Sequence, residues 1–136
     1  MGHFFHACRG QGAFRNDAAI HVSAIEDIGQ AVLCVNSLNG IQACSFAPRL
    51  LDWMEQFWSV RSMGGCLDAM MVSSGQADLW IEPTAQPWDL APLKVIAEEA
   101  GGRFFNFDGG RSIYGGDCVM CTPGLEGEAR KLVGLS

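Results

Sequence analysis

The segment Gln86–Gly102, QPWDLAPLKVIAEEAGG, is decisive for the fold because it carries a helix start and a helix stop within one short stretch. An aspartate, Asp89, stands where the helical pattern begins, and Gly101 follows the pattern as a stop signal. The apolar residues between them recur at helical spacing on one face: Leu93, Ile96, Ala97 and Ala100. The segment therefore predicts a helix over residues 89–100 with one side packed against a core.

The residues alone leave two interpretations of Asp89 open. As the helix N-cap, Asp89 would place Pro92 at the third helical position, where proline has no N–H to donate, so only the amide of Ala91 would remain. As a metal ligand, the carboxylate beside Trp88 has spare oxygens for a hard divalent cation. Magnesium typically takes one or two carboxylates together with waters and phosphate oxygens.

Composition and charge narrow the class of protein. The chain has 136 residues, 49% hydrophobic and 18% charged, which predicts one folded domain over residues 1–136 with a real core. The net charge of −6 and the lack of Lys or Arg runs argue against nucleic acid and anionic membrane as partners. The first residues do not have the pattern of a secretory signal, so we expect a cytoplasmic protein.

Six cysteines raise the question of a metal or redox site. Only Cys118 and Cys121 form a C-x-x-C, and they lie in a segment of strand type. Three residues apart on a strand, the two side chains point to opposite faces, so one zinc ion could not easily take both. We expect reduced thiols that pack as small hydrophobic side chains.

The rest of the chain alternates strand and helix signals, which predicts an α/β layered sheet. Strands are expected over residues 4–10, 19–23, 31–36, 77–82, 103–107 and 117–122, and residues 60–62 are a short strand or a connector. Helices are expected after a capping box at Ser23 and Glu26, and over residues 48–58, 66–75, 89–100 and 125–133. An apolar stripe in the second of these helices is expected to be core or interface: Leu50, Leu51, Met54, Phe57 and Trp58.

Two further features could carry chemistry. Gly64 and Gly65 precede a predicted helix, and such a place exposes backbone N–H groups that suit a phosphate. Glu82 ends a predicted strand, and strand ends carry ligands in open α/β sheets. A lone glutamate there is usually solvated, but near a phosphate site it could accept hydrogen bonds from substrate hydroxyls.

These features occur in a recognisable order. The segments RSMGGC, GQADLWIE, PWDLAP and EAGGR together resemble the inositol monophosphatase family, which includes inositol phosphatases and similar histidinol-phosphate phosphatases. The resemblance extends over almost the whole chain, from about Ala7 to Gly134. It implies a layered mixed β-sheet flanked by helices, as in the C-terminal lobe of the inositol monophosphatase or sugar phosphatase fold.

The resemblance also implies roles for single residues. Asp89 matches the aspartate that binds a catalytic magnesium, and Glu82 matches a glutamate that contacts substrate hydroxyls. Gly64, Gly65 and Cys66 match the loop that lies against the substrate. The order of Gly64, Gly65 and Cys66 is more similar to the histidinol-phosphate phosphatases than to the inositol phosphatases of the family. The histidinol-phosphate phosphatases, however, have an acidic residue where Gly65 stands. The resemblance therefore leaves the substrate open.

The chain departs from the family pattern in one large respect. Family members are about twice as long, and their first lobe carries a Glu-Glu pair and a D-P-x-D-G-T motif that this sequence lacks. We therefore expect a second lobe without the N-terminal metal-binding lobe, with no complete catalytic set and with magnesium bound weakly or not at all. The face left uncovered is expected to form a homo-oligomer, most simply a dimer, with three tryptophans as candidates: Trp53, Trp58 and Trp80. Trp53 and Trp58 could equally belong to the core.

Two other functions stay open. The chain could be a magnesium-dependent phosphomonoesterase for a small sugar, inositol or histidinol phosphate, either alone or completed by a separate first-lobe chain. It could instead bind a small molecule or a partner through the region of Gly64 and Glu82.

Overall fold

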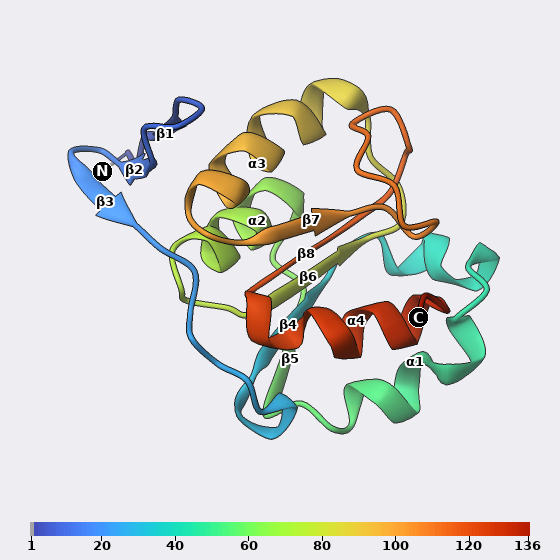
Figure 1. Cartoon of the computed structure of the whole chain (residues 1–136). Helices are drawn as coiled ribbons and strands as arrows, with labels where there is room; N and C mark the ends of the chain where they lie inside the picture. The colour runs from blue at the N-terminus through green and yellow to red at the C-terminus, as the bar shows by residue number, and fades with distance from the viewer. Residues whose placement is uncertain (1) are drawn as a thin grey trace.

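A computed structural model describes residues 2–136 and shows two β-sheets with helices on both sides of the larger one (Figure 1). The smaller sheet is an antiparallel meander of three short strands: β1 (Phe5–Ala7), β2 (Ala13–Arg15) and β3 (Ala18–Ile20). The prediction of only two strands before residue 24 was wrong, because the Gly-rich segment between them contains β2. Three-residue strands are too short to give an alternating pattern.

The larger sheet has five strands in the order β5-β4-β6-β8-β7. Its members are β4 (Val32–Val35), β5 (Ser59–Arg61), β6 (Leu79–Glu82), β7 (Arg103–Phe105) and β8 (Cys118–Cys121). Strand β4 runs parallel to both of its neighbours, whereas β8 runs antiparallel to both of its own. The predicted mixed sheet is therefore confirmed.

The helices cover both faces of this sheet, which confirms the layered α/β architecture. Helices α1 (Ala47–Met54) and α4 (Glu126–Val133) lie on one face, and α2 (Gly65–Ser73) and α3 (Pro87–Glu99) lie on the other (Figure 1). The connections also contain 3₁₀ turns: η1 (Ile28–Gln30), η2 (Leu38–Ala43) and η3 (Pro123–Leu125). No helix among residues 2–136 is long and apolar enough to cross a membrane.

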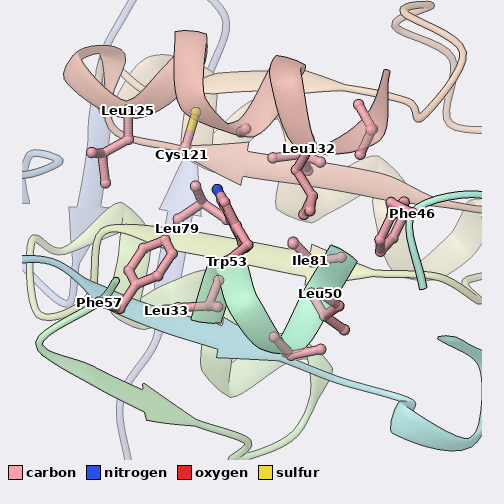
Figure 2. Packing of buried hydrophobic residues seen from close by; sticks show 14 of the residues in the cluster. Leu33, Phe46, Leu50, Trp53, Phe57, Leu79, Ile81, Cys121, Leu125 and Leu132 are labelled. Carbon is pink, nitrogen blue, oxygen red and sulfur yellow. The ribbon is translucent and has the colours of Figure 1, made fainter. Parts of the chain in front are cut away.

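Alternation along the strands divides the core into two clusters. In β4, Leu33 and Val35 face α1 and α4, while Cys34 faces α2 and α3. Figure 2 shows the first cluster, where Leu33, Leu79 and Ile81 meet Leu50 and Trp53 of α1 and Leu132 of α4. Cys118 and Cys121 belong to different clusters, which confirms that their side chains point to opposite faces.

The predicted capping box at Ser23 was wrong. The Ser23 hydroxyl donates to Asp78 Oδ1 at 2.5 Å, across 55 residues, and the only nearby helical turn is η1, capped by Asp27. The capping box is absent because residues 24–27 form no helix, and the Ser23 hydroxyl oxygen instead accepts the Ile25 N–H at 3.5 Å.

The apolar stripe near α1 divides between core and surface. The helix ends at Met54 and not at Trp58, so the chain turns before the stripe is complete. Leu50 and Phe57 are buried, whereas Leu51 is 78% exposed and Trp58 is 70% exposed. Of the three tryptophans proposed for an uncovered face, Trp80 is buried, so that prediction was wrong, and Trp53 is also buried, which agrees with its alternative as a core residue.

Candidate functional site

The larger sheet creates a crevice where its chain connections diverge. The parallel strands β4 and β6 are neighbours, but β4 leads to α1 on one face and β6 leads to α3 on the other (Figure 1). Open α/β sheets bind ligands at the carboxyl ends of such strands. The residues just beyond β4 and β6 are therefore the first place to look for a site.

A cavity of about 420 Å³ lies at this position. It is lined by residues from the two strand ends and from the first turns of α2 and α3: Asn36, Ser37, Gly65, Cys66, Glu82, Thr84, Trp88, Asp89, Pro92 and Leu93. Four of the five residues singled out in the sequence meet here, from segments far apart in the chain. Gly64 does not line the cavity but immediately precedes α2 as its N-cap.

Glu82 forms part of the inner wall of the cavity. Its side chain is only 3% exposed, at the last position of β6. Asn36 Nδ2 donates to Glu82 Oε2 at 2.5 Å, and the Thr84 N–H donates to Oε1 at 3.1 Å. Both oxygens are thus already oriented by the protein, so the carboxylate is fixed in place before any ligand arrives.

Asp89 lies at the mouth of the cavity, in the first turn of α3. The N-cap of α3 is Gln86, and Asp89 is the third helical residue, so the N-cap interpretation was wrong. Pro87 occupies the first position, where its fixed φ and missing N–H carry no cost. Asp89 Oδ2 accepts the Gln86 N–H at 3.3 Å, in the manner of a capping box, and the side chain is otherwise exposed.

The first turn of α2 forms a second wall. Gly64 has φ +122°, a conformation that favours glycine, and this allows the chain to enter the helix directly at Gly65. A Cβ on Gly65 would lie 3.3 Å from Asn36 Nδ2 and 3.5 Å from Glu82 Oε2. The missing side chain at Gly65 therefore keeps the space above the Asn36–Glu82 pair open. Cys66 is exposed beside it.

A buried carboxylate supports this wall from behind. Asp68 is fully buried, and its Oδ1 accepts the N–H of Met63 at 3.0 Å, which holds the loop that leads into α2. Burial raises the pKa of the Asp68 carboxyl, and the nearby charge of Glu82 adds to this effect. Its Oδ2 has no hydrogen-bond partner within residues 2–136. Asn36 and Asp68 could not be predicted from the sequence, because neither stands in a motif.

The cavity combines two opposite electrostatic features. The N-termini of α2 and α3 both open into it, and each brings partial positive charge. Glu82 and Asp89 bring negative charge, and no Lys, Arg or His is among the described residues that line the cavity. Such a site suits a ligand that carries both anionic and cationic or hydroxyl groups.

Comparison with known proteins identifies the origin of this arrangement. The sequence profile of the inositol monophosphatase family matches residues 1–134. The chain belongs to the inositol monophosphatase family. The sequence resemblance on which Asp89, Glu82 and the loop at Gly64 were singled out is therefore confirmed, while the roles of these residues stay predictions.

Relatives within the inositol monophosphatase family include two kinds of phosphatase. A histidinol-phosphatase of Mycobacterium tuberculosis is 36% identical over 124 residues, covering 88% of this chain and 47% of that protein. Inositol monophosphatase 1 of Homo sapiens is 31% identical over 115 residues, covering 80% of this chain and 41% of that protein. The chain spans about half the length of the curated relatives it matches.

Solved structures of the family share the fold. The extragenic suppressor protein suhB of Bartonella henselae superposes with a TM-score of 0.85 at 26% identity, covering 97% of this chain and 52% of that chain. The IMPase of Thermotoga maritima gives a TM-score of 0.83 at 26% identity, covering 96% of this chain and 51% of that chain. The α/β layers and the mixed sheet are thus those of the family.

The residues present fit one magnesium contact of the kind that the family resemblance implies. Asp89 offers a hard carboxylate in which Oδ1 accepts no hydrogen bond within residues 2–136. Both oxygens of Glu82 are already engaged, and no group of three or more His, Cys, Asp or Glu suited to a metal occurs in that part of the chain. Magnesium held through one carboxylate would need waters and substrate oxygens to complete its shell.

Proposed function

We propose that this chain corresponds to the second, substrate-recognising lobe of a magnesium-dependent phosphatase of the inositol monophosphatase family and is catalytically incomplete by itself. The observation that supports this most directly is the cavity, where Glu82, Asp89 and the first turns of α2 and α3 come together. In this proposal Asp89 holds magnesium, Glu82 orients the alcohol part of the ligand, and the loop from Gly64 to Cys66 lies against it.

The electrostatics of the cavity support a choice of substrate class. Two carboxylates line it without a cationic side chain among the described residues, so a phosphate ester whose alcohol part carries an ammonium or imidazolium group is favoured over a neutral polyol. Histidinol phosphate has such groups, and histidinol-phosphatases are among the relatives. In this proposal Glu82 accepts a further hydrogen bond from the cationic end, since each of its oxygens holds one donor and keeps a second lone pair.

The limited set of ligands supports catalytic incompleteness. Magnesium, when bound, would neutralise phosphate oxygens and help to generate the attacking water. Here Asp89 is the one cavity carboxylate with an unengaged oxygen, and one carboxylate binds magnesium weakly because the ion resists dehydration. Binding of a phosphate ester without turnover is therefore the expected behaviour of the isolated chain.

Calorimetry and a phosphate-release assay test this proposal together. Histidinol phosphate with magnesium should bind more tightly than inositol 1-phosphate, Asp89→Asn should remove the magnesium-dependent part of binding, and neither protein should release phosphate above background. Asp52→Asn, an exposed aspartate on α1, is the matched control. Turnover that Asp89→Asn abolishes would instead establish the alternative, an independent phosphomonoesterase. No magnesium-dependent binding would refute the proposal.

We also propose that the chain forms a homodimer through the free edge of the larger sheet. Strand β5 pairs only with β4, so its outer backbone edge is unpaired among residues 2–136. An apolar groove of about 450 Å³ runs beside it, lined by side chains that include the exposed Leu38, Leu51 and Val60. A two-fold axis would let the groove and edge of each copy cover those of the other.

The oligomeric state in solution decides this second proposal. Sedimentation equilibrium should give the dimer mass for the wild type, and Leu51→Glu should shift it to the monomer, because the substitution places a charge in the groove. The control Tyr114→Glu changes a similarly exposed side chain outside the groove and should stay dimeric. A wild-type chain that is monomeric at high concentration would contradict the dimer.

A further inference from the structure

A second polar cavity lies at the opposite end of α3 from the candidate site. It has a volume of about 480 Å³ and is lined by Arg9, Glu98, Glu99, Gly102, Arg103, Phe104, Arg111, Glu126 and Arg130. The last turn of α3 and the start of α4 approach the edge strand β7 from opposite faces of the sheet, and the cavity lies at this edge (Figure 1). Glu98 lies nine positions after Asp89 along α3, which places the two residues about 14 Å apart along the helix axis. One small ligand therefore cannot occupy both places.

The arginines of this cavity are arranged as two clamps around carboxylates. Arg9 Nη1 lies 3.0 Å from Glu98 Oε1, and Arg111 pairs with the other oxygen of Glu98. In the second clamp, Glu126 Oε2 lies 3.2 Å from Arg103 Nε, and Glu126 Oε1 lies 3.0 Å from Arg130 Nε. Four guanidinium groups thus meet three carboxylates in a chain whose net charge is −6.

The side-chain groups of the cavity that lack a partner among residues 2–136 are donors. Each oxygen of Glu98 and of Glu126 faces a cationic nitrogen. Glu99 accepts the N–H groups of Gly10 and Gly12, at 3.1 and 2.8 Å, so its oxygens are engaged too. The terminal guanidinium nitrogens of Arg103 and Arg130, in contrast, donate to no acceptor within residues 2–136.

The Arg130 guanidinium is also held rigidly. It lies over the Phe105 ring, 4.6 Å from the centroid, while its Nε faces Glu126. A guanidinium fixed in this way loses little freedom when it binds an anion, and its planar fork matches the oxygens of a phosphate.

We propose that this cavity is an anion-binding site that takes a small phosphate-bearing ligand without a metal ion, chiefly through Arg103 and Arg130. The ligand must bring acceptors, since the free groups of the cavity are donors. It must be compact, because the cavity has a volume of about 480 Å³. The site is independent of the proposed function, since it shares no lining residue with the cavity at Asp89.

Inorganic phosphate with a chelator present is the probe, because without magnesium the carboxylate-lined cavity repels an anion. Binding is followed at constant ionic strength by NMR of the arginine Nε–Hε groups. Arg103→Gln should weaken phosphate binding roughly tenfold, the loss expected for one charged hydrogen-bond donor. Arg61→Gln, at the far edge of the sheet, removes the same charge and should have no effect.

Glu126→Gln distinguishes a binding site from a purely structural ion-pair network. This change removes the carboxylate that competes for Arg103 and Arg130, so it should tighten phosphate binding by roughly tenfold. A network that only stabilises the fold predicts unchanged or weaker binding in this variant, and either result would overturn the proposal. Equal responses of Arg103→Gln and Arg61→Gln would overturn it as well. Asp89→Asn should leave phosphate binding unchanged, so failure of the proposed function would not affect this test.

Discussion

The hydrogen bond between Asn36 and Glu82 gives the sharpest prediction for the candidate site. Asn36→Ala would leave Glu82 Oε2 without its donor at 2.5 Å, in a side chain that is only 3% exposed. Water cannot readily replace the donor there, so the loss should approach the value of a hydrogen bond to a charged group, about 1.5–3 kcal/mol. For a chain of this size that corresponds to a decrease in Tm of roughly 5–10 °C.

Urea unfolding of single and double variants measures this directly. Glu82→Gln should reduce the effect of Asn36→Ala to about 0.5–1.5 kcal/mol, because a neutral partner forms the weaker bond. The control Asn39→Ala alters an exposed asparagine close by and should change the free energy of unfolding by less than about 0.5 kcal/mol. Equal losses for Asn36→Ala and Asn39→Ala would show that Glu82 is hydrated, and this result would refute the reasoning.

Three further predictions concern the surroundings of the site and the core. Burial raises the pKa of Asp68 above its ordinary value of 3.8, so its charged form destabilises the fold at neutral pH and the penalty disappears as pH falls through the raised pKa. Asp68→Asn should therefore be more stable than wild type near pH 7 and lose this advantage in acid, and a pH-independent difference in denaturant titrations would contradict this. Gly124→Ala should cost about 1–3 kcal/mol in urea unfolding, because a Cβ there would lie 2.4 Å from the Ile25 carbonyl oxygen, and a neutral effect would contradict the packing. In the native protein a thiol reagent should label the exposed Cys66 rapidly and Cys118 only at the rate of unfolding, since burial and the charge of Glu82 raise the pKa of the Cys118 thiol. Labelling is followed by mass spectrometry, and equal labelling rates for the two cysteines would disprove the burial of Cys118.

The residues of the site that stand in motifs could be predicted from the sequence, whereas the residues that hold them in position could not. Glu82 ends a segment with a strand pattern, and Asp89 stands at the start of a segment with a helix pattern. Both residues also belong to the motifs of the family. Asn36 contacts Glu82 across 46 residues of chain, and Asp68 is an ordinary polar residue inside a helix. No local pattern reports such contacts, because they exist only when the strand ends are brought together.

At the start of α3, the N-cap preference of aspartate predicts a helix start three residues later than the one observed. Asp89 is a good N-cap residue, and Pro92 weakened that interpretation without supplying another. Gln86 caps the helix in the structure, with Pro87 in the first position and Asp89 in the third. Aspartate is favourable at both positions near a helix N-terminus, so the sequence does not distinguish the two registers.

The sequence by itself determined four of the five strands of the larger sheet and the helices that alternate with them, the two faces of Cys118 and Cys121, and the family. These depend on periodicity and on motifs that act over a few residues. Only the tertiary structure decided which tryptophans are buried, that Ser23 bonds Asp78, and that arginines from separate elements share one cavity. The physical reason is that burial and pairing depend on which surfaces the fold brings into contact, and a side chain takes its strongest available partner however distant in sequence.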